Sequence, residues 1–234
     1  MQVFVSGGTG YIGQRLIRLL MDRRHSVSAV VRAASAKKLP LGCTPVEGNA
    51  LKASSFALRI APAETLVHLV GVSRPAPWKE AEFRAVDLAS AKASVEAACQ
   101  ARIQHFVYAS VAQPAPVMKS YIRVRAECER IIAGSGMSAT FVRPWYVLGP
   151  GHWWPVALTP IYRLLEQIPG TREGALRLGL VTIQEMVSAL AWAVENPAAG
   201  LRIISVPEIR SAAVRLRLGL GSDGGAATPA TAAR

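Results

Sequence analysis

Short apolar runs alternate with segments of helical periodicity along most of the chain. The first apolar run covers residues 2–6, and Ile12, Leu16 and Leu20 follow it at helical spacing. Further runs typical of strands cover residues 25–31, 44–47, 64–71, 104–110, 138–143 and 200–206, and helices are predicted over residues 51–61, 80–102, 118–134 and 180–196. Strands that alternate with helices in this way form a parallel sheet with right-handed crossovers. We therefore predict an α/β fold with a doubly wound parallel sheet.

The turn between the first strand and the first helix is rich in glycine. Gly8, Gly10 and Gly13 have the G-x-G-x-x-G spacing of a dinucleotide fold, in which glycines permit a tight turn, close approach to a pyrophosphate and packing of helix on strand. The free N–H groups and the dipole of the helix then face the phosphates. The alternative is a purely structural turn. We expect the turn to bind a dinucleotide through Gly7, Gly8, Thr9, Gly10, Tyr11, Ile12 and Gly13.

The end of the second predicted strand carries Arg32 where dinucleotide folds that prefer NAD usually place an acidic residue. The acid accepts hydrogen bonds from the ribose hydroxyls, and it would repel a phosphate. A guanidinium instead pairs well with a phosphate. Arg32 therefore predicts NADP as the preferred cofactor, with NAD as the alternative. A solvated basic loop is the other interpretation, and it suits Lys37 and Lys38 better than Arg32.

The run at residues 64–71 is almost continuously apolar, as in a central strand of a parallel sheet. Open α/β sheets bind ligands at the carboxyl ends of their strands. We therefore expect Val70 and Gly71 to contact the cofactor. His68 lies inside the run, and we expect it to pack in the core and not to act in catalysis.

The run VSGGTGYIG resembles the opening of the short-chain dehydrogenase/reductase superfamily. The spacing of Gly7, Gly10 and Gly13 is similar to that of its extended and atypical branches, which include nucleotide-sugar epimerases and NmrA-like NAD(P)-binding proteins. The run at residues 143–151, RPWYVLGPG, resembles a segment whose backbone lines the nicotinamide carboxamide in the extended branch. The resemblance covers about residues 1–207. It implies a Rossmann-like fold and cofactor contacts from Pro144 and Val147.

The resemblance also concerns the segment after the third strand. Relatives often carry Gly-Asp there, and the acid contacts the adenine amino group. This chain has Gly48, Asn49 and Ala50 at that place, and the Asn49 carbonyl can accept the same hydrogen bond. The resemblance therefore implies adenine contacts from Asn49 and Ala50. Asn49 also suits a helix N-cap.

Tyr121 and Arg125 lie one turn apart, early on the predicted helix 118–134. Active members of the superfamily have Tyr-x-x-x-Lys here and a serine after the preceding strand. The tyrosine is the general acid/base, and the lysine lowers its pKa and holds the nicotinamide ribose. In this chain Arg125 replaces the lysine, and the serine position falls at Val111, one residue after Ser110. An arginine can lower the pKa of a neighbouring tyrosine and bind ribose, but it stays protonated and cannot relay a proton.

Three interpretations of these residues stay open. Tyr121, Arg125 and Ser110 form a catalytic site, or Tyr121 and Arg125 hold the cofactor without driving chemistry, or the helix is purely structural. Trp153 and Trp154 follow the nicotinamide segment and either line an apolar substrate pocket or pack against a cap helix at residues 156–167.

The predicted domain organisation is a single NAD(P)-binding domain over residues 1–218. It carries a small C-terminal cap at about residues 151–180. Residues 219–234 are small, polar and rich in glycine, so we expect a flexible tail.

Composition and charge narrow the function classes. The net charge of +12 comes without a nucleic-acid motif, so we expect no nucleic-acid partner, and it suits a solvated surface, an anionic ligand, or an acidic protein or membrane surface. Scattered cysteines and histidines predict no metal site and a reducing compartment. No apolar run reaches eighteen residues, and a strand from residue 2 leaves no room for a cleaved signal peptide. These features favour a cytoplasmic location.

Together these features predict an NADP-binding atypical short-chain dehydrogenase/reductase, an oxidoreductase or epimerase-like enzyme that acts on a small molecule. The alternative is a non-catalytic NAD(P)-binding protein: a regulator, a redox sensor or an accessory protein of a larger complex. The departures at Arg125 and Val111 favour the alternative, while the glycine turn and the nicotinamide segment suit both.

Overall fold

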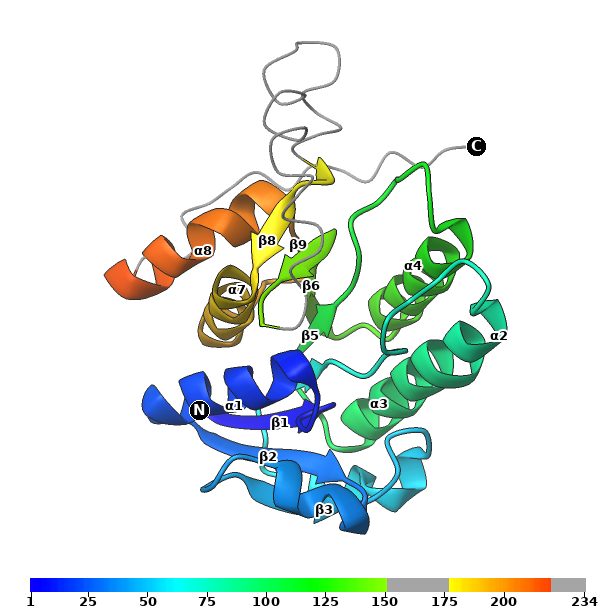
Figure 1. Cartoon of the computed structure of the whole chain (residues 1–234). Coiled ribbons are helices and arrows are strands. Elements are labelled where there is room, and N and C mark those ends of the chain that lie inside the picture. Colours follow the sequence, from blue (N-terminus) through cyan, green and yellow to red (C-terminus); the bar gives the residue numbers. More distant parts are fainter. Residues whose placement is uncertain (151–176, 220–234) are drawn as a thin grey trace.

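The computed structural model describes residues 1–150 and 177–219. Within these residues a seven-stranded parallel sheet has the order β3-β2-β1-β4-β5-β6-β9 (Figure 1). Its strands are β1 (Gln2–Ser6), β2 (Ser26–Val31), β3 (Thr44–Glu47), β4 (Thr65–His68), β5 (His105–Ala109), β6 (Ser138–Val142) and β9 (Leu201–Ile204). The strand order reverses between β1 and β4, at the kind of switch point where open α/β sheets bind ligands. The predicted doubly wound, Rossmann-like sheet is confirmed.

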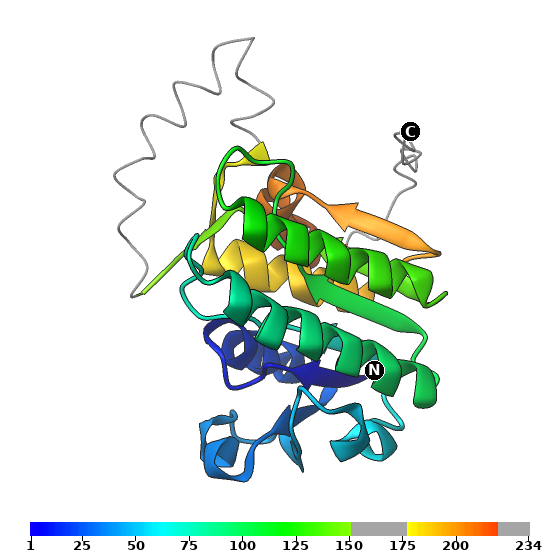
Figure 2. The ribbon, with the colours of Figure 1, turned by 90° about the vertical axis from the view of Figure 1, so that its right-hand side faces the viewer.

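Helices cover both faces of the sheet (Figures 1 and 2). The helices of one face are α1 (Tyr11–Asp22), α7 (Ile183–Glu195) and α8 (Val206–Leu218). The long helices of the other face are α3 (Ala89–Gln100) and α4 (Lys119–Gly134). Successive side chains of a strand point to opposite faces, so Val3 and Val5 pack in the first core and Phe4 in the second. His68, as predicted, is fully buried, with its Nδ1 2.9 Å from the Ser94 hydroxyl.

A second, two-stranded parallel sheet pairs β7 (Tyr146–Leu148) with β8 (Leu180–Thr182). The helix predicted from residue 180 therefore begins only at Ile183. Its start is fixed by a capping box, in which the Thr182 hydroxyl accepts a hydrogen bond from the Glu185 N–H at 3.2 Å and the Glu185 carboxylate accepts one from the Thr182 N–H at 2.6 Å. These contacts place the end of β7 beside the start of α7.

The helix predicted over residues 51–61 is wrong. The structure has two 3₁₀ turns there, η2 (Ala53–Ser55) and η3 (Ala57–Arg59). The Ser55 hydroxyl donates to the backbone carbonyl groups of Asn49 and Lys52, at 3.0 and 2.7 Å, and it accepts from the Asn49 N–H at 2.9 Å. Such local side-chain bonds offer the backbone an alternative to the helical pattern.

The helix predicted over residues 80–102 is confirmed as one continuous helical stretch, but it changes type along its length. α2 (Glu80–Glu82) passes into a π-helical segment, η4 (Phe83–Leu88), before α3. π-helical segments are rare in proteins, and those that occur often lie at functional sites. η1 (Ala33–Lys38) follows β2. Sequence analysis assigned no element to residues 207–218, where the structure has most of α8.

Some predictions lie outside the described residues. They concern Trp153 and Trp154, the cap up to residue 176, and the tail from residue 220 onward. In the described ranges, no helix combines the length and the apolar character needed to cross a bilayer.

Candidate functional site

The glycine turn is packed tightly on one side and open on the other. Gly7 has a φ of +90°, and a β-carbon there would lie 2.8 Å from the Leu69 carbonyl carbon. A β-carbon at Gly13 would clash with the Gly7 carbonyl oxygen and lie 2.8 Å from the α-carbon of Gly8. A β-carbon at Gly10 would meet, within 4 Å, only the Gly7 carbonyl oxygen, at 3.2 Å. The chain therefore needs glycine at positions 7 and 13 for its own fold and leaves space beside Gly10 for a ligand.

The start of α1 supplies hydrogen-bond donors to that space. Gly10 is the N-cap residue, and it offers no side-chain hydrogen bond to the first N–H groups of the helix. Such groups, together with the helix dipole, bind phosphate well. The open face at Gly10 and the uncapped N–H groups fit the diphosphate of a dinucleotide.

Arg32 follows β2 directly, as the N-cap residue of η1, and its side chain is exposed. The Arg32 carbonyl accepts the Ser35 N–H at 2.7 Å, whereas its guanidinium has no hydrogen-bond or ion-pair partner among the described residues. Lys37 and Lys38 are exposed at the end of η1. An exposed guanidinium at the carboxyl end of β2 is available to an anionic group on the ligand.

Asn49 takes part in a local turn after β3. Its side-chain carbonyl accepts the Leu51 N–H at 3.0 Å, and its own N–H donates to the Ser55 hydroxyl. Asn49 and Ala50 are both half-buried. Asn49 therefore forms an Asx turn and not the predicted helix N-cap, because the helix expected after it is absent, and the adenine contact stays a prediction.

The segment after β4 lies against both the glycine turn and α4. Gly7 packs on Leu69 and Val70 so closely that a β-carbon at position 7 would lie 2.9 Å from the Val70 nitrogen. A β-carbon at Gly71 would clash with the Arg125 guanidinium. Val70 and Gly71 therefore lie where the ends of β1 and β4 meet α4, as expected for the switch point.

Tyr121 lies in the first turn of α4, after Met118 in the left-handed conformation with a φ of +58°. Its half-buried ring packs against Phe83 with ring centres 5.0 Å apart, and the Arg125 guanidinium lies 5.1 Å from the Tyr121 ring centre. Burial raises the pKa of Tyr121, and the positive charge of Arg125 offsets only part of this effect. Tyr121 is thus a phenol at neutral pH.

Arg125 points into the protein interior. Its Nη1 donates to the Ala109 carbonyl at 2.8 Å and to the Tyr108 hydroxyl at 3.2 Å. Its Nη2 lies 2.7 Å from the Asp87 carboxylate. These partners hold the guanidinium beneath the ends of β4 and β5.

Asp87 is a site residue that sequence analysis missed. It lies in η4, its side chain is fully buried, and its second carboxylate oxygen accepts the Val72 N–H at 2.9 Å. Burial raises the pKa of Asp87, while Arg125 and the Val72 N–H counteract part of the rise. The sequence did contain a signal for this residue, because Asp87 is an acidic residue at a position of the predicted helix where the pattern otherwise places apolar side chains.

Ser110 and Val111 follow β5, and both are buried. The Ser110 N–H donates to the Val142 carbonyl and the Ala112 N–H to the Pro144 carbonyl, both at 2.8 Å. These bonds fix the register of the loop on both sides of Val111. The Ser110 hydroxyl is buried and has no hydrogen-bond partner in the described part of the chain. The position where the resemblance implies a serine hydroxyl is thus occupied by Val111. The two backbone hydrogen bonds keep Ser110 from shifting by one residue into that position.

The segment expected to line the nicotinamide is anchored to α4. Arg143 donates to both carboxylate oxygens of Glu129, at 2.9 and 2.5 Å, and the Gln113 side-chain amide donates to Glu129 at 3.0 Å. Pro144 is buried and Val147 is half-buried. Glu129 and Gln113, which sequence analysis did not single out, thus join the loop after β5 and the segment after β6 to α4.

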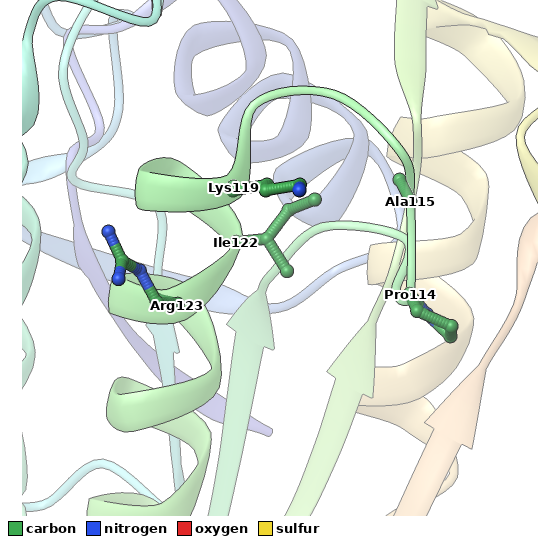
Figure 3. A pocket seen from close by; sticks show the side chains of 5 residues that line it. All are labelled: Pro114, Ala115, Lys119, Ile122 and Arg123. Carbon is green, nitrogen blue, oxygen red and sulfur yellow. The ribbon is translucent and has the colours of Figure 1, made fainter.

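An open cavity of about 320 Å³ lies beside the start of α4. It is lined by Pro114, Ala115, Lys119, Ile122 and Arg123. Figure 3 shows Lys119 and Ile122 pointing from α4 toward the loop with Pro114, whereas Arg123 points away from it. The Arg123 guanidinium instead lies 3.5 Å from Glu80. The cavity borders the helix of Tyr121 on its outer side.

The fold and the glycine turn define a dinucleotide-binding protein. The sequence matches a family model described as NAD(P)H-binding over residues 7–150, more than half of the chain. The chain belongs to this NAD(P)H-binding family, within the atypical short-chain dehydrogenase/reductase and NAD-dependent epimerase-like group.

Individual relatives agree with this assignment. A 4-hydroxy-2-methyl-3-oxo-4-farnesyl-3,4-dihydroquinoline-1-oxide ketoreductase of Stigmatella aurantiaca is 28% identical over 64% of this chain and 51% of its own length, so the chain spans about half of that protein. A 3-diazoavenalumate denitrifying reductase of a Streptomyces species is 29% identical over 86% of this chain and 74% of its own length. The crystal structure of the Bordetella bronchiseptica enzyme WbmH in complex with NAD+ has a TM-score of 0.65, with 20% identity over 94% of this chain and 82% of WbmH. That likeness shows the shared fold.

Proposed function

We propose that the protein is an NADP-dependent oxidoreductase or epimerase-like enzyme, in which Tyr121 exchanges a proton with a small-molecule substrate. One observation carries the proposal: Tyr121 stands in the first turn of α4, next to the ends of β4 and β5, with the Arg125 guanidinium 5.1 Å from its ring centre. The names of two relatives, a ketoreductase and a reductase, support it.

Each part of the site has a distinct task in this proposal. The N–H groups of the glycine turn bind the diphosphate, Arg32 pairs with the 2′-phosphate, and the backbone at Pro144 and Val147 orients the nicotinamide. When bound, the cofactor donates or accepts a hydride at a substrate carbon. The Tyr121 hydroxyl donates or accepts the proton at the substrate oxygen. Arg125 acts through Tyr121, because both of its Nη atoms are engaged inside the protein.

The test measures NADPH oxidation, and NADP+ reduction, across a panel of ketones, aldehydes, nucleotide sugars and the corresponding alcohols. Tyr121→Phe is expected to lower the turnover number at least about 100-fold, because general acid/base groups contribute this much, while NADPH affinity stays within about twofold. Arg123→Gln, an exposed change on the same helix, is the matched control and is expected to retain turnover. Unchanged turnover in Tyr121→Phe would contradict the proposal.

A second candidate is a non-catalytic NADP-binding protein. It is favoured by Val111, which is buried where active relatives have a serine hydroxyl, and by the bonds that fix the loop register around it. Tight NADPH binding with no turnover on any member of the panel would favour this candidate. In that case Tyr121→Phe would have no rate to change, and weaker NADPH binding in this variant would indicate that Tyr121 helps to hold the cofactor.

A further inference from the structure

The buried ion pair of Asp87 and Arg125 joins η4 to α4 beneath Tyr121. The two charged groups are 2.7 Å apart, and their side chains are 0% and 7% exposed. Charges inside a protein are poorly screened by solvent, so each of them acts strongly on its neighbours. The same two segments hold Tyr121, because Phe83 of η4 packs on its ring at 5.0 Å. Asp87 therefore belongs to the environment of the Tyr121 phenol.

Alone, the Arg125 charge would favour the phenolate form of Tyr121, because an opposite charge nearby stabilises the ionised group. Asp87 places a negative charge on the same guanidinium. At Tyr121 the pair acts as a dipole in place of a full positive charge. What remains is the loss of solvent contact, which disfavours the phenolate.

We propose that Asp87 is a positioning residue that cancels the charge of Arg125 at Tyr121 and so keeps Tyr121 a proton donor. This inference rests on the proposed function and narrows it to carbonyl reduction. A hydride from the reduced nicotinamide adds to the carbonyl carbon, while the electron pair of the C=O bond takes the Tyr121 proton. The carbonyl becomes an alcohol, the nicotinamide is oxidised, and water returns a proton to Tyr121. Epimerisation begins instead with removal of a hydroxyl proton, for which a phenolate is needed.

The other groups around Tyr121 do not restore a positive field. The titratable and charged groups that act on its surroundings are Arg125 and Cys128 from α4, Asp87 from η4 and Tyr108 from β5. Burial raises the pKa of Tyr121, Arg125 lowers it, and Asp87 and Cys128 act in the same direction as burial. Burial likewise raises the pKa of Cys128 and, strongly, that of Tyr108, so both stay neutral near pH 7. Asp87 is thus the only one of these groups whose charge opposes that of Arg125.

The test follows the ionisation of Tyr121 in the full chain by NMR of ¹³Cζ-labelled tyrosine, with the Tyr121 signal assigned from Tyr121→Phe. Measurements are made with and without NADPH. Asp87→Asn keeps an acceptor for the Val72 N–H but removes the charge, and it is expected to raise the ionisation constant of Tyr121 about tenfold or more. Arg125→Gln is expected to lower it. The Asp87→Asn/Arg125→Gln double variant removes both charges and is expected to return it close to the wild-type value.

Glu80→Gln is the matched control, because it makes the same chemical change in the same helical stretch at an exposed ion pair. It is expected to leave the Tyr121 titration unchanged. The proposal is overturned if the Tyr121 signal moves at the same pH in wild type, Asp87→Asn and Arg125→Gln. It is also overturned if the Asp87→Asn signal stays at the phenol position up to alkaline unfolding. If Asp87→Asn does not fold, Arg125→Gln and the double variant decide the question. Equal ionisation constants of Tyr121 in the wild type, in Arg125→Gln and in the double variant overturn the proposal.

A second measurement separates this inference from the proposed function. The substrate panel is run in both directions at pH 7, and carbonyl reduction is expected to exceed alcohol oxidation. The rate of alcohol oxidation is expected to rise with pH as Tyr121 ionises, and Asp87→Asn is expected to shift this rise to lower pH. If no substrate turns over, the proposed function fails, while the NMR titration still decides the role of Asp87. If turnover is found but the titration does not respond to Asp87, only the inference fails.

Discussion

The hydroxyl group of Tyr11 lies against the α-carbon of Gly149, in the space that a β-carbon at position 149 would take. Tyr11 opens α1 beside the glycine turn, and Gly149 belongs to the segment 143–151 that is expected to line the nicotinamide. The contact therefore joins the two ends of the expected cofactor site. We expect that Gly149→Ala displaces Tyr11 and weakens NADPH binding about tenfold, which corresponds to about 1.4 kcal/mol. Calorimetric titration with NADPH measures the effect.

Two further variants test the cause of that loss. Tyr11→Phe in the Gly149→Ala background removes the clashing hydroxyl and is expected to recover most of the affinity. Gly134→Ala, at the end of α4, is the control, because a β-carbon there meets nothing within 4 Å. Equal affinity in wild type and Gly149→Ala would show that the contact has no part in cofactor binding.

Substitution of Gly13 is expected to lower the stability of the fold, whereas substitution of Gly10 is expected to weaken cofactor binding. Gly13→Ala drives a β-carbon into the Gly7 carbonyl, so it is expected to lower the free energy of unfolding by about 1–3 kcal/mol. Gly10→Val points into the open space beside the turn. It is expected to leave stability nearly unchanged and to weaken NADPH binding more than about tenfold. Urea unfolding and calorimetry on both variants separate the effects, and full affinity in Gly10→Val would contradict the diphosphate assignment.

Arg32 is expected to determine the choice between the two pyridine nucleotides. NADPH should bind more tightly than NADH to the wild-type protein, because the exposed guanidinium pairs with the 2′-phosphate. Arg32→Ala is expected to erase this difference. Lys37→Ala removes an exposed cation of the same segment and should change the ratio of the two dissociation constants less than about twofold. A preference that persists in Arg32→Ala would refute the role of Arg32.

His68 is expected to make the fold sensitive to acid. Burial, with a smaller effect of the Arg125 charge, lowers the pKa of His68 from 6.5 to about 3. Below about pH 6.5 the unfolded chain therefore binds a proton at His68, whereas the folded chain does so only near pH 3. The free energy of unfolding consequently falls as the pH drops from about 6.5 toward about 3. This group alone is expected to cost roughly 3 kcal/mol between pH 7 and pH 4.

Urea unfolding at pH 7, 5 and 4 measures this loss. His68→Gln is expected to be less stable at pH 7 and to show a flatter dependence below pH 6.5. His105, whose pKa burial lowers to about 4, retains its own share of the acid sensitivity in that variant. The same slope in wild type and His68→Gln would contradict the assignment of the effect to His68.

Local patterns predicted the sheet well, because each strand and its turn leave a signal within a few neighbouring residues. The glycine turn is such a case, since the contacts that require glycine at position 13 are made with Gly7 and Gly8 of the same turn. The helix at residues 51–61 failed because a single hydroxyl, that of Ser55, satisfies the backbone in another way.

Long-range contacts account for most of what sequence reasoning missed at the site. Arg125 occupies the lysine position of the Tyr-x-x-x-Lys pattern. The direction of its side chain, however, is set by Asp87, which lies in another helical segment. Glu129 likewise gains its task only when β6 brings Arg143 beside α4. No periodicity or spacing encodes these pairs, because each member is ordinary in its own segment.

The ladder between β7 and β8 brings Tyr146 opposite Leu180, so two segments that are far apart in the sequence lie side by side at this point. Whatever residues connect these strands, their two attachment points are held side by side by backbone hydrogen bonds and by the capped start of α7. We expect that changes to the connecting residues leave these hydrogen bonds in place, because the bonds join only β7, β8 and the start of α7. Under the proposed function, an anchor of this kind would allow substrate choice to change in evolution while the residues for the cofactor stay the same.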